Sequence, residues 1–129
     1  SPLHLRSVLK GSAVWEALLA AWRDGAIVAG SSAGAMVLTD SMIDPRGGGF
    51  SLGLGLVEQL AVIPHHQDPQ ATNVLRSVML APAGLAVAGI PERTALIWDG
   101  RESGWREAGA GHVTVYRDGA VGTLADLPA

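Results

Sequence analysis

The segment Gly30-Ser31-Ser32-Ala33-Gly34 combines residue types and a spacing that could activate a serine hydroxyl. It follows a short apolar run, Ala26 to Ala29, and leads into a second one, Ala33 to Leu38. A strand that turns sharply into a helix needs small residues at the turn, because a Cβ on either flanking glycine would clash. We therefore expect an exposed Ser32 on a nucleophile elbow. The alternative is a Gly/Ser-rich turn without chemistry, and the expected strand and helix around the motif favour the nucleophile.

A serine nucleophile needs a base, and the chain offers four histidines: His4, His65, His66 and His112. His65 follows the apolar run Val62-Ile63-Pro64 and so stands at the C-terminal end of the next expected parallel strand. Active sites of open α/β sheets lie at that edge. We therefore expect His65 as the general base. His66 should point elsewhere if His65 points inward, and His4 and His112 are expected to be ordinary surface or core residues.

Four segments resemble the aspartyl dipeptidase and cyanophycinase family of serine peptidases: Gly30 to Met36, Gly53 to Leu56, Ile63 to His65 and Gly89 to Leu96. The resemblance runs over almost the whole chain. It implies the class I glutamine amidotransferase-like fold, with Ser in place of that fold's usual Cys. It also implies Ser32 as nucleophile and His65, 33 residues later, as general base.

The resemblance further implies an acidic residue between the nucleophile and the histidine, which would orient the imidazole and stabilise its cation. Asp44 fits best and Asp40 next. Because Asp44 opens a glycine-rich loop, turn initiation is an alternative role for it. Asp68 and Glu92 are further candidates. Gln67 occupies the position where glutamine amidotransferases carry a glutamate, which counts against that arrangement.

Oxyanion donors are expected at two places. The amide of Ala33 lies at an expected helix start and can donate to an oxyanion. In the family, the other donor comes from an upstream Gly-Gly turn, and Ser1-Pro2-Leu3 resembles the residues directly after it. We therefore expect residues 1–129 to form a single domain that is the C-terminal part of a fuller one.

The expected reaction is hydrolysis of small peptides or peptide-like amides by a Ser-His-acid triad. The Arg-rich sequence that usually follows the histidine in the family is absent here, and the first arginine after His65 is Arg76. The alternatives are an esterase or acyltransferase that uses the same site, and a non-catalytic or regulatory binding protein that keeps the fold.

The elements expected to position these residues alternate between helix and strand. All-apolar strands between helices predict a mostly parallel sheet in a three-layer, flavodoxin-like α/β fold. After Pro91, turn signals separate short strands and predict an antiparallel β-meander at one edge. In chain order we expect helices near 1–9 and 12–23, a strand over 26–29, a helix over 33–38, a strand over 61–63, a helix near 74–79, a strand over 85–90, and short strands over 94–98, 104–107 and 112–117.

The composition narrows the partners. The chain has 129 residues, with nine Lys and Arg against twelve Asp and Glu. The formal net charge of −3 and the lack of a basic run argue against nucleic acid or an acidic membrane as the main partner. No apolar run approaches the roughly 18 residues of a membrane span. Cysteine is absent, which excludes disulfides and a thiolate nucleophile and makes a reducing cytoplasm the expected location.

No cofactor is expected. His65, His66 and Asp68 could suggest a metal site, but no further ligand recurs at a familiar spacing, so we expect no metal. The expected partner is a small peptide substrate, and self-association into a homo-oligomer is left open.

Overall fold

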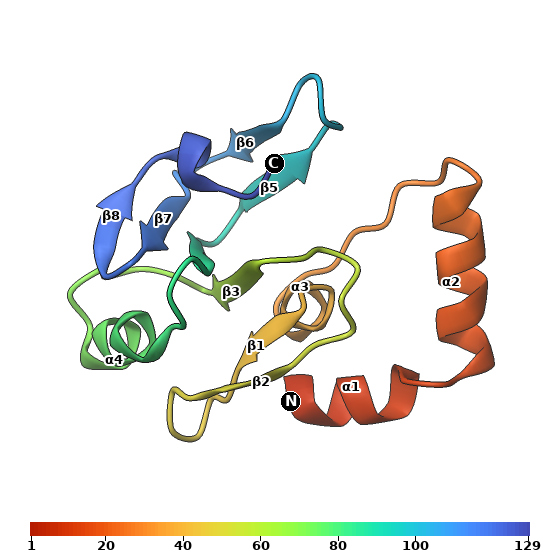
Figure 1. Ribbon diagram of the computed structural model, residues 1–129, viewed down its shortest axis with the longest axis horizontal. Coiled ribbons are helices and arrows are strands. Elements are labelled where there is room, and N and C mark those ends of the chain that lie inside the picture. The colour runs from red at the N-terminus through yellow and green to blue at the C-terminus, as the bar shows by residue number, and fades with distance from the viewer.

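A four-stranded mixed sheet organises the computed structural model, which describes residues 1–129 (Figure 1). Its strand order is β3 (Leu60–Pro64), β4 (Ala86–Ile90), β7 (Thr114–Arg117) and β8 (Ala120–Gly122). The pair β3–β4 is parallel, whereas β7 is antiparallel to both β4 and β8. The expected α/β class is confirmed, with a sheet that is mixed.

Helices and two separate hairpins surround this sheet. The helices are α1 (Pro2–Leu9), α2 (Ala13–Arg23), α3 (Ala33–Val37), α4 (Thr72–Leu80) and a closing 3₁₀ helix (Leu124–Asp126); the hairpins are β1 (Ser41–Ile43) with β2 (Phe50–Leu52), and β5 (Thr94–Trp98) with β6 (Trp105–Gly109). The first two helices begin where the sequence predicts, at the caps Ser1 and Ser12. None of the helices is both long and apolar enough to cross a bilayer.

The sheet is covered on both faces, which explains why its strands are almost entirely apolar. One apolar cluster contains Val87 and Tyr116, and α3, α4 and the β1–β2 hairpin pack there. A second cluster contains the alternate residues Ala86, Ala88 and Val115, with the 3₁₀ helix beside it. This division follows the period of two along each strand.

Two strand expectations differ from the structure. The glycine-rich loop expected from Asp44 onward contains β2, which pairs with β1 directly before it. Neither strand was expected, and each is only three residues long. The expected continuous meander is not formed either. The β5–β6 hairpin stands as its own sheet, and β7 pairs with β4 instead of β6.

The strand expected over 26–29 is wrong. Residues 26–30 belong to no helix or strand, and Ile27 is 94% exposed. A strand needs a neighbour to accept its backbone hydrogen bonds, and none of the described strands lies beside this segment. In Figure 1 the segment leads from α2, at the edge of the molecule, to α3. Among the residues of α2, only Trp15 is buried.

Candidate active site

Ser32 lies in a strained turn directly before α3. It is the N-cap of that helix, with φ 52° and ψ −119°, and its side chain makes no capping bond. Positive φ is uncommon for a residue other than glycine and is typical of functional sites. A Cβ at Gly30 would lie 2.4 Å from the carbonyl oxygen of Gly34, so a glycine is required at position 30. At Gly34 itself a Cβ would meet nothing within 4 Å, which corrects the expectation of a clash on both sides.

The imidazole of His65 lies beside this serine. It directly follows β3, and its Nε2 lies 2.9 Å from Ser32 Oγ. Like the serine, His65 has a left-handed backbone, with φ 54°. The side chain remains 59% exposed, so the pair is open to solvent. The other histidines do not join this site: His4 is exposed on α1, and His112 bonds to Glu107 at 2.8 Å.

Glu92 completes the line of contacts on the far side of the imidazole. Its Oε1 contacts Nδ1 of His65. Because an ionised carboxylate only accepts, Nδ1 carries the proton of a neutral ring, and Nε2 is left to accept from the Ser32 hydroxyl. The sheet brings the two residues together, since Pro64 at the end of β3 pairs with Ile90 at the end of β4.

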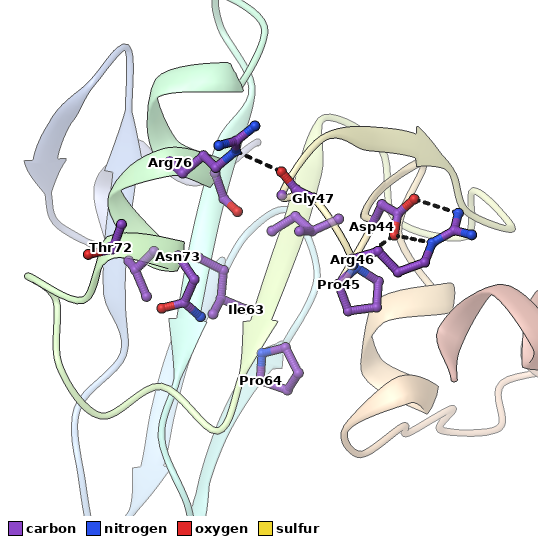
Figure 2. A pocket seen from close by; sticks show the side chains of 13 residues that line it. Asp44, Pro45, Arg46, Gly47, Ile63, Pro64, Thr72, Asn73 and Arg76 are labelled. Atoms are coloured by element: carbon purple, nitrogen blue, oxygen red, sulfur yellow. Dashed lines mark hydrogen bonds and ion pairs between the residues drawn. The ribbon is translucent and has the colours of Figure 1, made fainter.

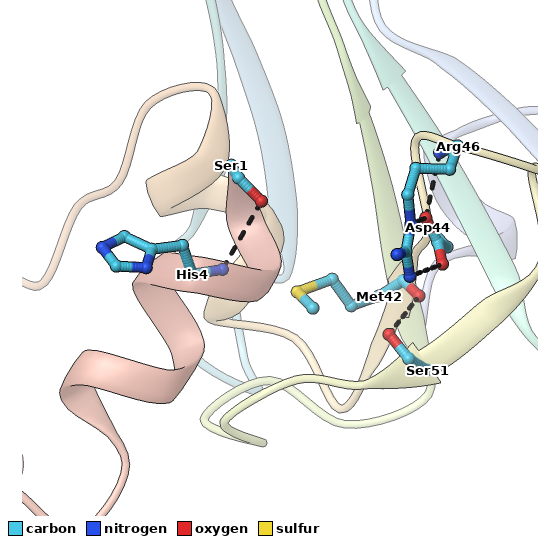
Figure 3. A network of polar contacts seen from close by, with 6 residues as sticks. All are labelled: Ser1, His4, Met42, Asp44, Arg46 and Ser51. Atoms are coloured by element: carbon cyan, nitrogen blue, oxygen red, sulfur yellow. Dashed lines mark hydrogen bonds and ion pairs between the residues drawn. The ribbon is translucent and has the colours of Figure 1, made fainter.

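The structure does not bring Asp44 to His65. Its carboxylate accepts from the backbone N of Arg46 at 2.9 Å and from two nitrogens of the Arg46 side chain at 3.0 and 2.8 Å (Figure 3). These bonds lower the pKa of Asp44 from 3.8 to about 2. Turn formation, the alternative role, accounts for them. The expectation that Asp44 orients the base is therefore corrected: the acid beside the imidazole is Glu92.

The other two aspartates considered for the orienting acid, Asp40 and Asp68, also bond to other groups. Asp40 accepts from the backbone N of Gln59 at 2.7 Å and from that of Leu60 at 3.3 Å, and these hydrogen bonds stabilise the start of β3. Asp68 accepts from the backbone N of Gln70 at 2.9 Å in the turn before α4. No group of three or more His, Cys, Asp or Glu side chains is placed to hold a metal ion.

The signal for Glu92 was present in the sequence. Parallel neighbouring strands end at the same edge of a sheet, which is why His65, after the strand over 61–63, is expected in the site. For the same reason the first acidic residue after the strand over 85–90, Glu92, is expected at that edge.

A cleft of about 580 Å³ lies between the loop that follows β1 and the N-terminal half of α4 (Figure 2). One wall is formed by Ile63 and Pro64, directly before His65. The Asn73 side chain points toward Pro64, whereas the Arg46 guanidinium turns away to Asp44.

Arg76 stands at the rim of the same cleft. Its Nε donates to the carbonyl of Gly47 at 2.8 Å, which links α4 to the loop. The cleft is therefore bounded by the end of β3 and by a helix and a loop that are hydrogen-bonded to each other.

Comparisons with known proteins identify the family of this chain. The profile of peptidase family S51 matches residues 2–104. The crystal structure of a peptidase from an acI-B1 Actinobacterium aligns with a TM-score of 0.73 and 27% identity, over 91% of this chain and 50% of that one. The chain thus spans about half the length of that solved structure. The search of curated sequences found no significant match. This chain belongs to peptidase family S51, the aspartyl dipeptidase and cyanophycinase family that its motifs resemble.

Proposed function

We propose that this chain carries the catalytic centre of a serine peptidase, with Ser32 as nucleophile, His65 as general base and Glu92 as the orienting acid. The observation that carries the proposal is the continuous line of contacts from Ser32 Oγ through both ring nitrogens of His65 to the Glu92 carboxylate. A nucleophile bonded to a base, which is held in turn by an acid, is the arrangement by which hydrolases activate a serine.

The proposed reaction begins when Ser32 Oγ attacks the carbonyl carbon of an amide. Its proton passes to Nε2 of His65, and Glu92 stabilises the imidazolium that forms. The same proton then goes to the leaving amine, which departs and leaves an acyl ester on Ser32. Water then attacks the acyl ester and gives a proton to His65, which returns that proton to the departing Ser32 Oγ as the acid is released.

The position of Ser32 at the head of α3 supports a nucleophile elbow in this reaction. The strained φ of 52° presents the hydroxyl at the surface. Ala33, the first residue of the helix, has an amide that the helix leaves without an internal partner, and we assign it as an oxyanion donor. The three-layer, class I glutamine amidotransferase-like arrangement of the sheet belongs to the same proposal.

We assign small peptides or peptide-like amides as the substrate class. The cleft beside Pro64 has a volume typical of small-ligand sites. Its lining carries the polar side chains of Thr72, Asn73, Arg76 and Ser77, and Arg46 is paired with Asp44. Because Pro64 borders the cleft directly before His65, we assign the cleft to a short part of the substrate beside the scissile bond.

An active-site-directed fluorophosphonate, followed by assays on short peptides and matching esters, tests the proposal. We expect the parent to label on Ser32 and to cleave peptides. Ser32→Ala should abolish labelling and lower kcat by about 10⁴-fold or more, with the fold unchanged. Ser31→Ala, at the exposed neighbouring residue, is the matched control and should retain both.

Each contrary outcome favours a different alternative. Labelling that persists in Ser32→Ala would refute the nucleophile. Labelling with turnover of esters alone would favour the esterase or acyltransferase, and a parent that neither labels nor turns over would favour a binding protein.

A further inference from the structure

His66, the neighbour of the base, is buried inside the molecule. It is only 5% exposed, and its Nε2 lies 2.8 Å from the hydroxyl of Tyr116, which is 3% exposed on β7. The two rings meet edge to face, with centroids 5.9 Å apart. Gly89 on β4 makes room for this arrangement, because a Cβ there would lie 2.5 Å from Cδ2 of the His66 ring.

The backbone on both sides of His65 is held by the end of β4. Pro64 pairs with Ile90 in the parallel ladder, and the backbone N of His66 donates to the carbonyl of Ile90 at 3.1 Å. Between these two fixed residues, His65 adopts φ 54°, a conformation that non-glycine residues avoid. Such a conformation persists only where the surroundings impose it.

Glu92 depends on the same strand end. It lies two residues beyond Ile90, so the last residue of β4 supplies the carbonyl that binds the His66 backbone, and the segment directly after β4 supplies the carboxylate that contacts the His65 ring. A shift of His66 would therefore change the angle at which the imidazole meets both of its partners.

Resting on the proposed function, we propose that His66 and Tyr116 are positioning residues. Their buried hydrogen bond holds His65 in its left-handed conformation, with the imidazole between Ser32 and Glu92.

This bond connects two uncharged groups. Burial lowers the pKa of His66 below its usual 6.5 and raises the pKa of Tyr116 above 10.0. The charged residue that acts on both is Asp68, and its effect on the pKa of His66 is smaller than that of burial. A buried polar group that loses its partner is destabilised, so removal of either side should release the other from its position.

The test compares two substitutions of His66. Glutamine can place an amide nitrogen near the position of Nε2 and reach the Tyr116 hydroxyl, whereas asparagine is too short. We expect His66→Asn and Tyr116→Phe to lower kcat about 10- to 100-fold, the range associated with a misplaced catalytic group, and to leave KM within about twofold. His66→Gln should keep kcat within about threefold of the parent. The double variant His66→Gln/Tyr116→Phe should have a kcat as low as that of Tyr116→Phe alone.

A second readout does not require turnover. Nitrogen-15 NMR of the histidine side chains reports which ring nitrogen of His65 carries the proton. We expect a fixed Nδ1–H form in the parent and in His66→Gln, and a mixture of both forms in His66→Asn and Tyr116→Phe. Glu92→Gln serves as the control, because it should change the His65 signals while the His66 signals stay unchanged.

The two readouts separate the inference from the proposed function. A parent that fails to label on Ser32 but shows the tautomer pattern refutes the peptidase and supports the positioning role. Variants that fold, retain kcat and keep the parent tautomer overturn the inference. Should His66→Asn not fold, Tyr116→Phe keeps the ring and decides the question by itself.

Discussion

Replacing Glu92 in two ways separates its charge from its effect on the tautomer of His65. Glu92→Ala removes the carboxylate but leaves either ring nitrogen of His65 free to carry the proton. Glu92→Gln keeps the shape, and its amide NH₂ can donate to Nδ1. Donation to Nδ1 forces the proton onto Nε2, which can then no longer accept from Ser32.

The size of the charge effect follows from the exposure of the pair. Two unit charges about 4 Å apart interact by about 1 kcal/mol in water and about 4 kcal/mol at an effective dielectric constant of 20. The His65 and Glu92 side chains are 59% and 58% exposed, which places them toward the aqueous end of that range. Since about 1.4 kcal/mol corresponds to a tenfold change in rate, we expect Glu92→Ala to lower kcat by roughly 10- to 100-fold. Loss of the correct tautomer should take Glu92→Gln toward about 10⁴-fold.

Single-turnover acylation of Ser32 by a chromogenic ester measures this step directly, with Asp44→Asn as the matched control. The control should retain kcat within about threefold, because Asp44 is bonded to Arg46 and not to His65. The reasoning would be refuted if Asp44→Asn lost activity while Glu92→Gln remained within tenfold of the parent. Equal losses in Glu92→Ala and Glu92→Gln would refute the tautomer argument alone.

Three further predictions concern the turn, the buried histidine and the close approach at β4. Gly30→Ala should overpack the turn, which should lower the free energy of unfolding by roughly 1–3 kcal/mol and slow fluorophosphonate labelling. The control Gly34→Ala should have the same melting temperature as the parent. Folding lowers the pKa of His66, so at low pH the unfolded chain binds a proton that the folded chain excludes, and the free energy of unfolding should fall as the pH drops below about 6.5. Urea titrations should show a smaller fall for His66→Gln than for the parent. Gly89→Ala should reduce kcat and stability together because its Cβ would strike the His66 ring, and an unchanged melting temperature and kcat would contradict the packing argument.

Local sequence patterns predicted the helices and buried strands of the sheet. Ser1 and Ser12 are true caps, and the apolar runs around Val62 and Val87 form the parallel pair that carries the site. These elements were predictable because caps and continuous apolar runs reflect interactions within a few residues of one another.

The failures concern information that no local pattern holds. Residues 26–29 are as apolar as β3, yet a strand also requires a neighbour, and the apolar run does not specify one. The place of Asp44 between the nucleophile and the histidine predicts an orienting acid, but Arg46, two residues on, satisfies its carboxylate. Glu92 is 27 residues from His65 along the chain, so it is found only by comparing the ends of two strands, which the register of β3 with β4 makes neighbours.

That register has a consequence for how this site can diverge. The segment from Gln67 to Gly84 connects His65 to β4, the strand that precedes Glu92. No residue of this segment takes part in the contacts of His65 with Ser32 and Glu92. Insertions or deletions before α4 would alter the cleft, which Thr72 and Asn73 line, while the ladder kept His65 and Glu92 aligned. Relatives could therefore exchange one substrate for another by changing the length of this crossover and still retain the same proton path.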